Sequence, residues 1–263
     1  MDGLLSTSPS VDFKNGVTLH TIKDEMFNIY IIKMSAADNR FNPSFCGSLS
    51  SSLDHIKSAI KSADSCKSAL IVTGSGKFFS NGLDLQFLMT QSDPNQFLVE
   101  HYEPLLNKFL TFPLPTVALV NGHAFAGGMC LALALDYRVS LNNSNPKRPV
   151  LLSMNELLIR ASIPAGMLSV LRAKLASPRI LRDCIYARRW TLQEAHTDGI
   201  IDCLFSSEDE LMAFTKSKAI EFKYAEVLES IKAETYREAS SLLLDPHSDK
   251  LDPFRFAMPK SKL

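Results

Sequence analysis

The sequence predicts an α/β fold built from successive strand–strand–helix units, with a helical region towards the C-terminal end. Residues 17–22 and 27–34 are apolar and β-branched and flank the short segment KDEM, a pattern typical of a hairpin. Residues 69–73 (ALIVT) and 116–120 (TVALV) predict short buried strands, each followed by a glycine-rich turn and a helix. Residues 208–244 carry apolar positions at helical spacing, which predicts the helical C-terminal region.

The remaining elements follow from the same periodicities. Apolar residues recur at helical spacing over 49–60 and again over 97–112, where two prolines end the second helix. Residues 129–135 predict an apolar helix after the second glycine turn. Further short strands are expected at 137–141, 150–152 and 199–205.

The length of 263 residues is sufficient for one large core with a smaller helical appendage. We expect the core to occupy residues 1–205. Residues 206–263 then form a C-terminal region that combines helices with a targeting tail. No fixed-period repeat and no low-complexity linker divides the sequence into two globular halves.

The composition argues against several classes of function. The 28 basic residues equal the 28 acidic ones, so no overall charge favours nucleic acid or an anionic membrane. Five cysteines without a CxxC spacing are expected to be free thiols, and no histidine–cysteine cluster predicts a metal site. No apolar run approaches the roughly 20 residues that span a bilayer. The N-terminal segment lacks a basic stretch and does not predict a signal peptide.

Two glycine-rich segments indicate the chemistry. They are residues 74–85 (GSGKFFSNGLDL) and 121–131 (NGHAFAGGMCL). We expect Leu83 to open a helix with its N–H unpaired, and Gly127 to place its N–H at the positive end of the next helix. Two such donors can hold one acyl oxygen while negative charge grows on it. Either turn alone is more often structural, whereas the pair favours catalysis on an acyl thioester.

These segments resemble the two signature segments of the enoyl-CoA hydratase/isomerase (crotonase) superfamily. Asn39-Arg40-Phe41-Asn42 resembles the loop of that family that binds the CoA adenine. Met154-Asn155-Glu156 and the segments after it are similar to the peroxisomal enoyl-CoA isomerases of plants. The resemblance extends from about residue 17 to residue 205 and is looser in the C-terminal helices. It implies a crotonase-like spiral of ββα units that assembles as a homotrimer or hexamer.

The resemblance also implies the roles of individual residues. The two oxyanion donors map onto the N–H groups of Leu83 and Gly127. The substrate is an acyl-CoA thioester, and no metal or separate cofactor is implied. The residues expected to bind the CoA ester or to shape its pocket are Arg40, Phe41, Ser80, Asn81, Gly82, Asp84, Leu85 and Gly128.

Glu156 is expected to be the catalytic base. Hydratases of this family carry two glutamates, and the position of the first, three residues after Gly127, holds Cys130 here. A thiol of ordinary acidity is a poor substitute for a carboxylate that orients water. A single base suits moving a proton between two carbons, so the resemblance favours an isomerase that converts 3-enoyl-CoA (cis or trans) to trans-2-enoyl-CoA in fatty acid β-oxidation. The apolar neighbours of Glu156 predict a raised pKa.

Several alternatives stay open at this point. The same scaffold serves an enoyl-CoA hydratase, an acyl-CoA thioester hydrolase or a catalytically inactive CoA-binding subunit. Arg160 replaces the glycine that is usual in related isomerases; it could pair with Glu156, reach a CoA phosphate or face solvent, and solvent is favoured. His123 and Cys130 are expected to be structural. Lys77, like Arg40, either meets a CoA phosphate or is solvated.

The last three residues of the sequence indicate where in the cell the protein is located. Ser261, Lys262 and Leu263 form the SKL tripeptide that the peroxisomal import receptor binds. Two nearby prolines, Pro253 and Pro259, disfavour a helix that would hide this tail. We therefore expect import into peroxisomes.

Overall fold

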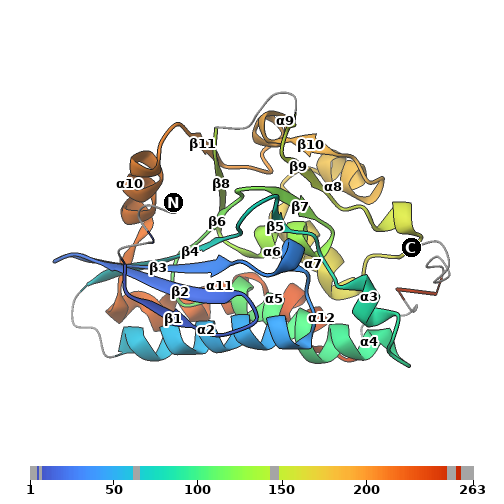
Figure 1. Ribbon diagram of the computed structural model, residues 1–263, viewed down its shortest axis with the longest axis horizontal. Coiled ribbons are helices and arrows are strands. Elements are labelled where there is room, and N and C mark those ends of the chain that lie inside the picture. The colour runs from blue at the N-terminus through green and yellow to red at the C-terminus, as the bar shows by residue number, and fades with distance from the viewer. Residues whose placement is uncertain (1–4, 6–7, 62–65, 143–147, 248–252, 256–263) are drawn as a thin grey trace.

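A mixed sheet forms the centre of the computed structural model, which describes residues 5, 8–61, 66–142, 148–247 and 253–255 (Figure 1). Its strand order is β1-β2-β3-β4-β6-β8-β11. The strands are β1 (Ser10–Asp12), β2 (Val17–Lys23), β3 (Phe27–Met34), β4 (Lys67–Thr73), β6 (Thr116–Leu119), β8 (Tyr137–Leu141) and β11 (Cys203–Phe205). The pair β2–β3 is the expected antiparallel hairpin, whereas the pairs from β3 to β11 are parallel.

A second, smaller sheet lies beside the first and is built largely from the two glycine segments. Its order is β10-β9-β7-β5, with β10 (Trp190–Thr191), β9 (Leu151–Ser153), β7 (His123–Phe125) and β5 (Phe78–Ser80). Strands β5 and β7 pair in parallel, and so do β7 and β9. Each glycine segment therefore supplies a second strand between the main-sheet strand and the helix, which gives the strand–strand–helix unit.

The helices complete these units and the C-terminal region. They are α2 (Pro43–Lys61), α3 (Leu85–Leu88), α4 (Pro94–Phe97), α5 (Glu103–Leu110), α6 (Gly127–Ala134), α7 (Ala165–Lys174), α8 (Pro178–Ile185), α9 (Leu192–Thr197), α10 (Glu208–Lys218), α11 (Ala225–Thr235) and α12 (Arg237–Leu244). Short helical turns are η1 (Ala37–Asn39), the π-helical η2 (Leu98–Tyr102), η3 (Glu156–Ile159) and η4 (Phe222–Tyr224). A short strand, β12 (Ile220–Glu221), pairs with the start of β4.

Several predicted elements differ from the structure in their bounds or continuity. The expected helix over 97–112 is interrupted by the π-helical turn, because Pro104 has no N–H and its ring crowds the carbonyl four residues earlier. The helix after the first glycine turn begins at Leu85 and not at Leu83, since the Asp84 side chain caps it by accepting from the N–H of Phe87. The strand expected over 199–205 is confined to β11.

The core has two parts, one on each face of the main sheet. Alternate side chains of a strand point to opposite faces. Ile29 and Ile31 of β3 therefore pack in the cluster that includes Leu211 of α10, whereas Tyr30 and Ile32 pack in the larger cluster on the α2 side. Figure 1 shows α10 over one face of the sheet and α2 along the other. Each fully buried aliphatic side chain contributes about 1.5–3 kcal/mol.

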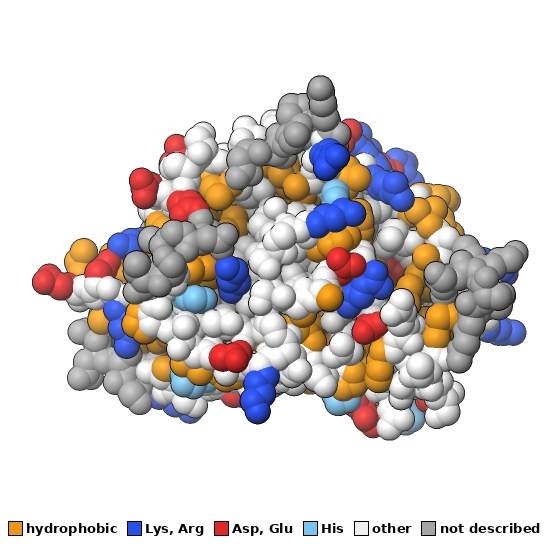
Figure 2. Space-filling model, in the orientation of Figure 1, with side chains coloured by type: hydrophobic (Ala, Val, Ile, Leu, Met, Phe, Trp, Pro, Cys, Tyr) orange, Lys and Arg blue, Asp and Glu red, His pale blue; other side chains and the backbone are white. Residues whose placement is uncertain are grey.

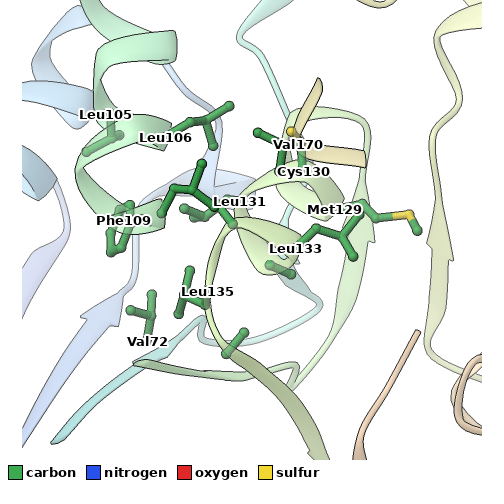
Figure 3. Close-up of a cluster of buried hydrophobic side chains, with 14 of the residues drawn as sticks. Val72, Leu105, Leu106, Phe109, Met129, Cys130, Leu131, Leu133, Leu135 and Val170 are labelled. Carbon is green, nitrogen blue, oxygen red and sulfur yellow. The ribbon is translucent and has the colours of Figure 1, made fainter. Parts of the chain in front are cut away.

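Helix α6 is enclosed on all sides. Every residue from Gly127 to Ala134 is buried, as expected for a helix that is apolar all round. In Figure 3, Cys130 lies beside Val170 of α7, and Leu131 faces Leu106 and Phe109 of α5. This packing fixes the start of α6, where the second glycine turn ends.

The C-terminal helices are joined to the core by a buried ion pair. The ammonium group of Lys232 on α11 lies 2.6 Å from a carboxylate oxygen of Asp136, and it donates to the carbonyls of Phe112 and Leu114 at 2.9 Å each. All three ammonium protons thus have acceptors, which offsets the cost of burying the charge.

The described surface carries both charges. On the face in Figure 2, acidic and basic side chains are interspersed with polar and apolar surface. Within the described ranges, no helix is long and apolar enough to cross a bilayer.

Candidate active site

The two glycine turns are in direct contact. Gly82 has a φ of +76°, and a Cβ atom there would lie 2.9 Å from the carbonyl oxygen of Phe125 and 3.2 Å from the nitrogen of Gly127. At Gly128, a Cβ would come within 2.2 Å of the carbonyl oxygen of Ser80. The close approach requires glycine at both positions. The contact therefore brings the backbone of Leu83, the residue after Gly82, close to the backbone of Gly127.

The first turn is held by the loop that contains Phe41. The N–H of Phe41 donates to the carbonyl of Gly82 at 2.8 Å, and the N–H of Asp84 donates to the carbonyl of Phe41 at 2.9 Å. Leu83 lies between these two bonds in a parallel bridge with Phe41, so its own N–H faces the other way. In the part of the chain that the structure describes, that N–H has no hydrogen-bond partner. The expected free donor is present, although it does not come from a helix start.

The second turn is a strained helix start. Ala126 has φ 49° and ψ −122°, a conformation that costs a non-glycine residue about 1–3 kcal/mol. Its N–H is anchored to the carbonyl of Ser153 at 2.9 Å. Helix α6 begins at Gly127, two residues before the start expected at residue 129, and no side chain caps it. The first N–H groups of the helix are thus left for another acceptor.

A cavity of about 150 Å³ opens beside these turns. Leu83 and Ala126, one from each turn, form part of its wall, and Glu156 lies in the same wall. The remaining lining residues are Arg40, Asn81, Leu85, Asn155, Ile159, Ala161, Ser162, Pro164, Met167, Pro253 and Phe254.

Glu156 is a buried acid without a partner. It opens η3 shortly after β9 ends, and only 6% of its surface is exposed. Neither carboxylate oxygen has a hydrogen-bond partner among the described residues. Burial in apolar surroundings raises the pKa of Glu156 to about 7. An acid with these properties can take and return a proton near neutral pH.

Two other titratable residues, both in the second glycine segment, are excluded from acid–base roles by their surroundings. Cys130 is completely buried, and burial raises the pKa of its thiol well above the ordinary range. The Nδ1 atom of His123 accepts from the N–H of Leu151 at 3.0 Å, and partial burial lowers the pKa of this histidine. His123 therefore joins β7 to β9 and is structural.

Arg160 faces solvent. Its side chain is exposed, and no ion pair joins it to Glu156 among the described residues. Its backbone has φ 60° and ψ 29°, the left-handed conformation at the C-terminal end of η3. Glycine adopts this conformation without strain, whereas arginine does not.

The predicted substrate-binding residues fall into two groups. Arg40, Asn81 and Leu85 line the cavity with Glu156, and Arg40 also lines a larger cavity of about 960 Å³ next to it. Of the others, Phe41, Ser80, Gly82 and Gly128 are buried behind the cavity wall, and Asp84 faces the larger cavity. Gly127, the expected second donor, is buried next to Ala126, which lines the small cavity.

Sequence reasoning missed two kinds of residue. Met167 and Ile159 line the cavity, but their apolar side chains carry no signal that separates them from the core. Pro253 and Phe254 reach the cavity from the C-terminal end, and the carbonyl of Pro253 accepts from the N–H of Ser162 at 2.8 Å. The residues of the SKL tripeptide lie outside the described residues.

The fold and the site together define a class of protein. Residues 25–243 match the family described as enoyl-CoA hydratase/isomerase. The chain belongs to this family and has the crotonase fold with a C-terminal helical region.

Curated relatives include two plant proteins. Enoyl-CoA delta isomerase 1, peroxisomal, of Arabidopsis thaliana is 33% identical over 69% of this chain and 73% of its own length. Enoyl-CoA delta isomerase 2, peroxisomal, of the same plant is 30% identical over 85% of this chain and 92% of its own.

Solved structures share the fold. A protein of Mycobacterium tuberculosis, named enoyl-CoA isomerase in one solved structure and probable enoyl-CoA hydratase in another, has in the first a TM-score of 0.70 and 24% identity, over 87% of this chain and 94% of that one. An enoyl-CoA hydratase/isomerase family protein of Pseudomonas syringae has a TM-score of 0.73 and 19% identity, over 88% and 96%.

Proposed function

We propose that this protein is an isomerase that shifts the double bond of 3-enoyl-CoA, cis or trans, to give trans-2-enoyl-CoA in fatty acid β-oxidation. The observation that carries the proposal is the single buried carboxyl group of Glu156, without a partner, in the cavity walled by both glycine turns. Relatives named enoyl-CoA delta isomerase at 30–33% identity support the same reaction.

The proposed mechanism moves one proton. The thioester oxygen accepts from the N–H groups of Leu83 and Gly127, which stabilise the negative charge that develops on it. The carboxylate of Glu156 takes a proton from C2, and the C2–H electron pair joins a dienolate. The same carboxyl group then delivers the proton to C4. The double bond now joins C2 and C3, and the base is regenerated.

The raised pKa of Glu156 suits both steps. A carboxyl group of ordinary acidity is a weak base towards carbon, whereas a pKa of about 7 increases its basicity while leaving a large fraction ionised at neutral pH. Proton transfer of this kind uses no metal and no redox cofactor. The acyl-CoA is the substrate.

The CoA portion is proposed to extend from the small cavity into the larger one. Arg40 lines both, and its guanidinium is about one-third exposed beside Asp38. A cation at this junction can meet a CoA phosphate. Asp84 and Phe87 line the larger cavity, which has room for the nucleotide.

Two further proposals concern the cellular location and the oligomeric state of the enzyme. The names of two plant relatives include the word peroxisomal, which supports a peroxisomal location through the import receptor. A homotrimer or hexamer is proposed from the family resemblance. Exposed apolar side chains on or beside α11 (Tyr224, Val227 and Ile231) would be covered in such an assembly.

The test is a comparison of two reactions with purified protein. We expect conversion of 3-hexenoyl-CoA to the 2-enoyl ester and much slower hydration of crotonyl-CoA. Glu156→Gln should lower the isomerisation rate by about 10²–10⁴-fold. Glu226→Gln, an exposed acid on α11, is the matched control and should leave the rate unchanged.

Each alternative has its own outcome. Hydration as fast as isomerisation would make the protein a hydratase, and release of free CoA would make it a thioester hydrolase. A wild-type protein that binds acyl-CoA without either reaction would be an inactive CoA-binding subunit. Isomerisation at the wild-type rate in Glu156→Gln would exclude Glu156 as the base.

A further inference from the structure

Tyr102 contacts Gly127, the second proposed donor residue, and Phe41, which holds the first donor residue, Leu83, in place. Its side chain is completely buried. Its hydroxyl group donates to the carbonyl oxygen of Gly127 at 2.6 Å. Its ring lies against the ring of Phe41, with 4.9 Å between the ring centroids.

Each of these two contacts fixes one donor. Gly127 begins α6, so a bond to its carbonyl restrains the first turn of the helix and the orientation of the peptide groups there. Phe41 forms hydrogen bonds to the residues before and after Leu83. Its N–H donates to the carbonyl of Gly82, and its carbonyl accepts from the N–H of Asp84. The position of the Phe41 ring and backbone therefore sets the position of the Leu83 N–H.

The backbone that carries Tyr102 is unusual. Tyr102 ends the π-helical turn η2, in which the N–H of Glu103 donates to the carbonyl of Leu98, five residues earlier. Such turns are rare and occur frequently at functional sites. The extra residue in the turn rotates Tyr102 relative to a regular helix. In this orientation its side chain contacts both Gly127 and Phe41.

We propose that Tyr102 is a positioning residue that sets the spacing between the Leu83 and Gly127 donors. The inference rests on the proposed oxyanion site, but it adds a residue that touches neither substrate nor reacting atoms. A residue of this kind affects the transition state more than substrate binding, because the donors tighten on the oxygen as charge develops.

The direct readout is the carbonyl stretching frequency of bound hexanoyl-CoA, a saturated ester that cannot isomerise. Two well-placed donors polarise the carbonyl and lower its frequency below that of the free ester. In Tyr102→Phe, which keeps the ring and removes the hydroxyl, we expect the frequency to return part of the way to the free value. The affinity for hexanoyl-CoA should stay within about threefold, while kcat for 3-hexenoyl-CoA falls about 10–100-fold.

The matched control is Tyr236→Phe. Tyr236 also uses its hydroxyl in a partly buried bond, accepting from the ammonium group of Lys174 at 3.1 Å, but it does not line the cavity. This variant should keep the wild-type frequency and kcat. A Tyr102→Phe protein with wild-type frequency and kcat would overturn the proposal.

Three further outcomes are distinguished by the same measurements. If Tyr102→Phe does not fold, Phe41→Leu removes the supporting ring and keeps the hydroxyl; it should raise the frequency as well, and an unchanged frequency contradicts the inference. If the wild type lowers the frequency without isomerising 3-hexenoyl-CoA, the proposed reaction is wrong while the role of Tyr102 is still measured. If the wild type does not lower the frequency, both proposals fail.

Discussion

The N–H of Ala161 donates to the carbonyl oxygen of Glu156 at 3.0 Å, across a turn in which Arg160 is left-handed. This bond closes η3, the short helical turn that carries the proposed base. The turn needs a residue with positive φ, and an arginine there is strained by about 1–2 kcal/mol. The strain lies next to the site, while the arginine side chain itself points to solvent.

Replacing this arginine by glycine should stabilise the protein. Arg160→Gly removes the left-handed strain but adds backbone freedom to the unfolded chain, for a net gain of about 0.5–1 kcal/mol. Thermal unfolding should then shift upwards by about 1–4 °C. Arg160→Ala is the matched control, because it removes the charge and keeps the Cβ, and it should give no such gain. A lower midpoint in Arg160→Gly would contradict this account.

The rate of isomerisation should depend on pH through Glu156. The base must be ionised, and its pKa in the folded protein is about 7. The value of kcat/KM should therefore rise with pH and level off above neutrality, with an apparent midpoint near 7. Below the midpoint it should fall about tenfold per pH unit. A profile that stays flat down to pH 5 would rule out a base with a raised pKa.

The same pKa predicts a change in stability. The pKa of Glu156 is raised from an ordinary 4.5 to about 7 on folding, so the favourable contribution of its neutral form is lost as pH rises between these values. At about 1.36 kcal/mol per pKa unit, the full loss is about 3 kcal/mol. Glu156→Gln cannot ionise, so it should gain about 2–3 kcal/mol over the wild type between pH 5 and pH 8.

Urea denaturation at the two pH values measures this difference. Glu226→Gln, whose side chain is exposed, should follow the wild type at both. An equal offset between Glu156→Gln and the wild type at pH 5 and pH 8 would show that the acid is not held neutral by burial.

Phe254 should limit the length of the acyl chain. It lines the small cavity with Glu156, and the bond from the N–H of Ser162 to the carbonyl of Pro253 holds its segment in place. Phe254→Ala enlarges the cavity, so the preference for 3-decenoyl-CoA over 3-hexenoyl-CoA, as a ratio of kcat/KM values, should rise roughly tenfold. Phe222→Ala, outside this cavity, is the control. An unchanged ratio would place the chain elsewhere.

The local sequence pattern was sufficient to predict the strands, the helix and the glycine turns that surround the site. Alternation and helical spacing predicted the hairpin β2–β3, the buried strands β4 and β6 and the helix α6, because these periodicities encode which face of an element is buried. Glycine at positions 82 and 128 predicted tight turns, and the structure shows that both also allow two backbones to approach closely. Glu156 was assigned as the base from the family resemblance, its apolar neighbours predicted a raised pKa, and the structure places it in the cavity.

Local sequence was therefore enough for the strands and the glycine turns, since each depends on neighbours within a few residues, whereas the acid was assigned from the family resemblance. The residues that support and close the site became visible only in the folded chain. Tyr102 reaches Gly127 across 25 positions, and Pro253 meets Ser162 from the far end of the chain. Such contacts arise from packing between distant segments, and an apolar or aromatic side chain in a helix or loop carries no local mark of which segment it will meet.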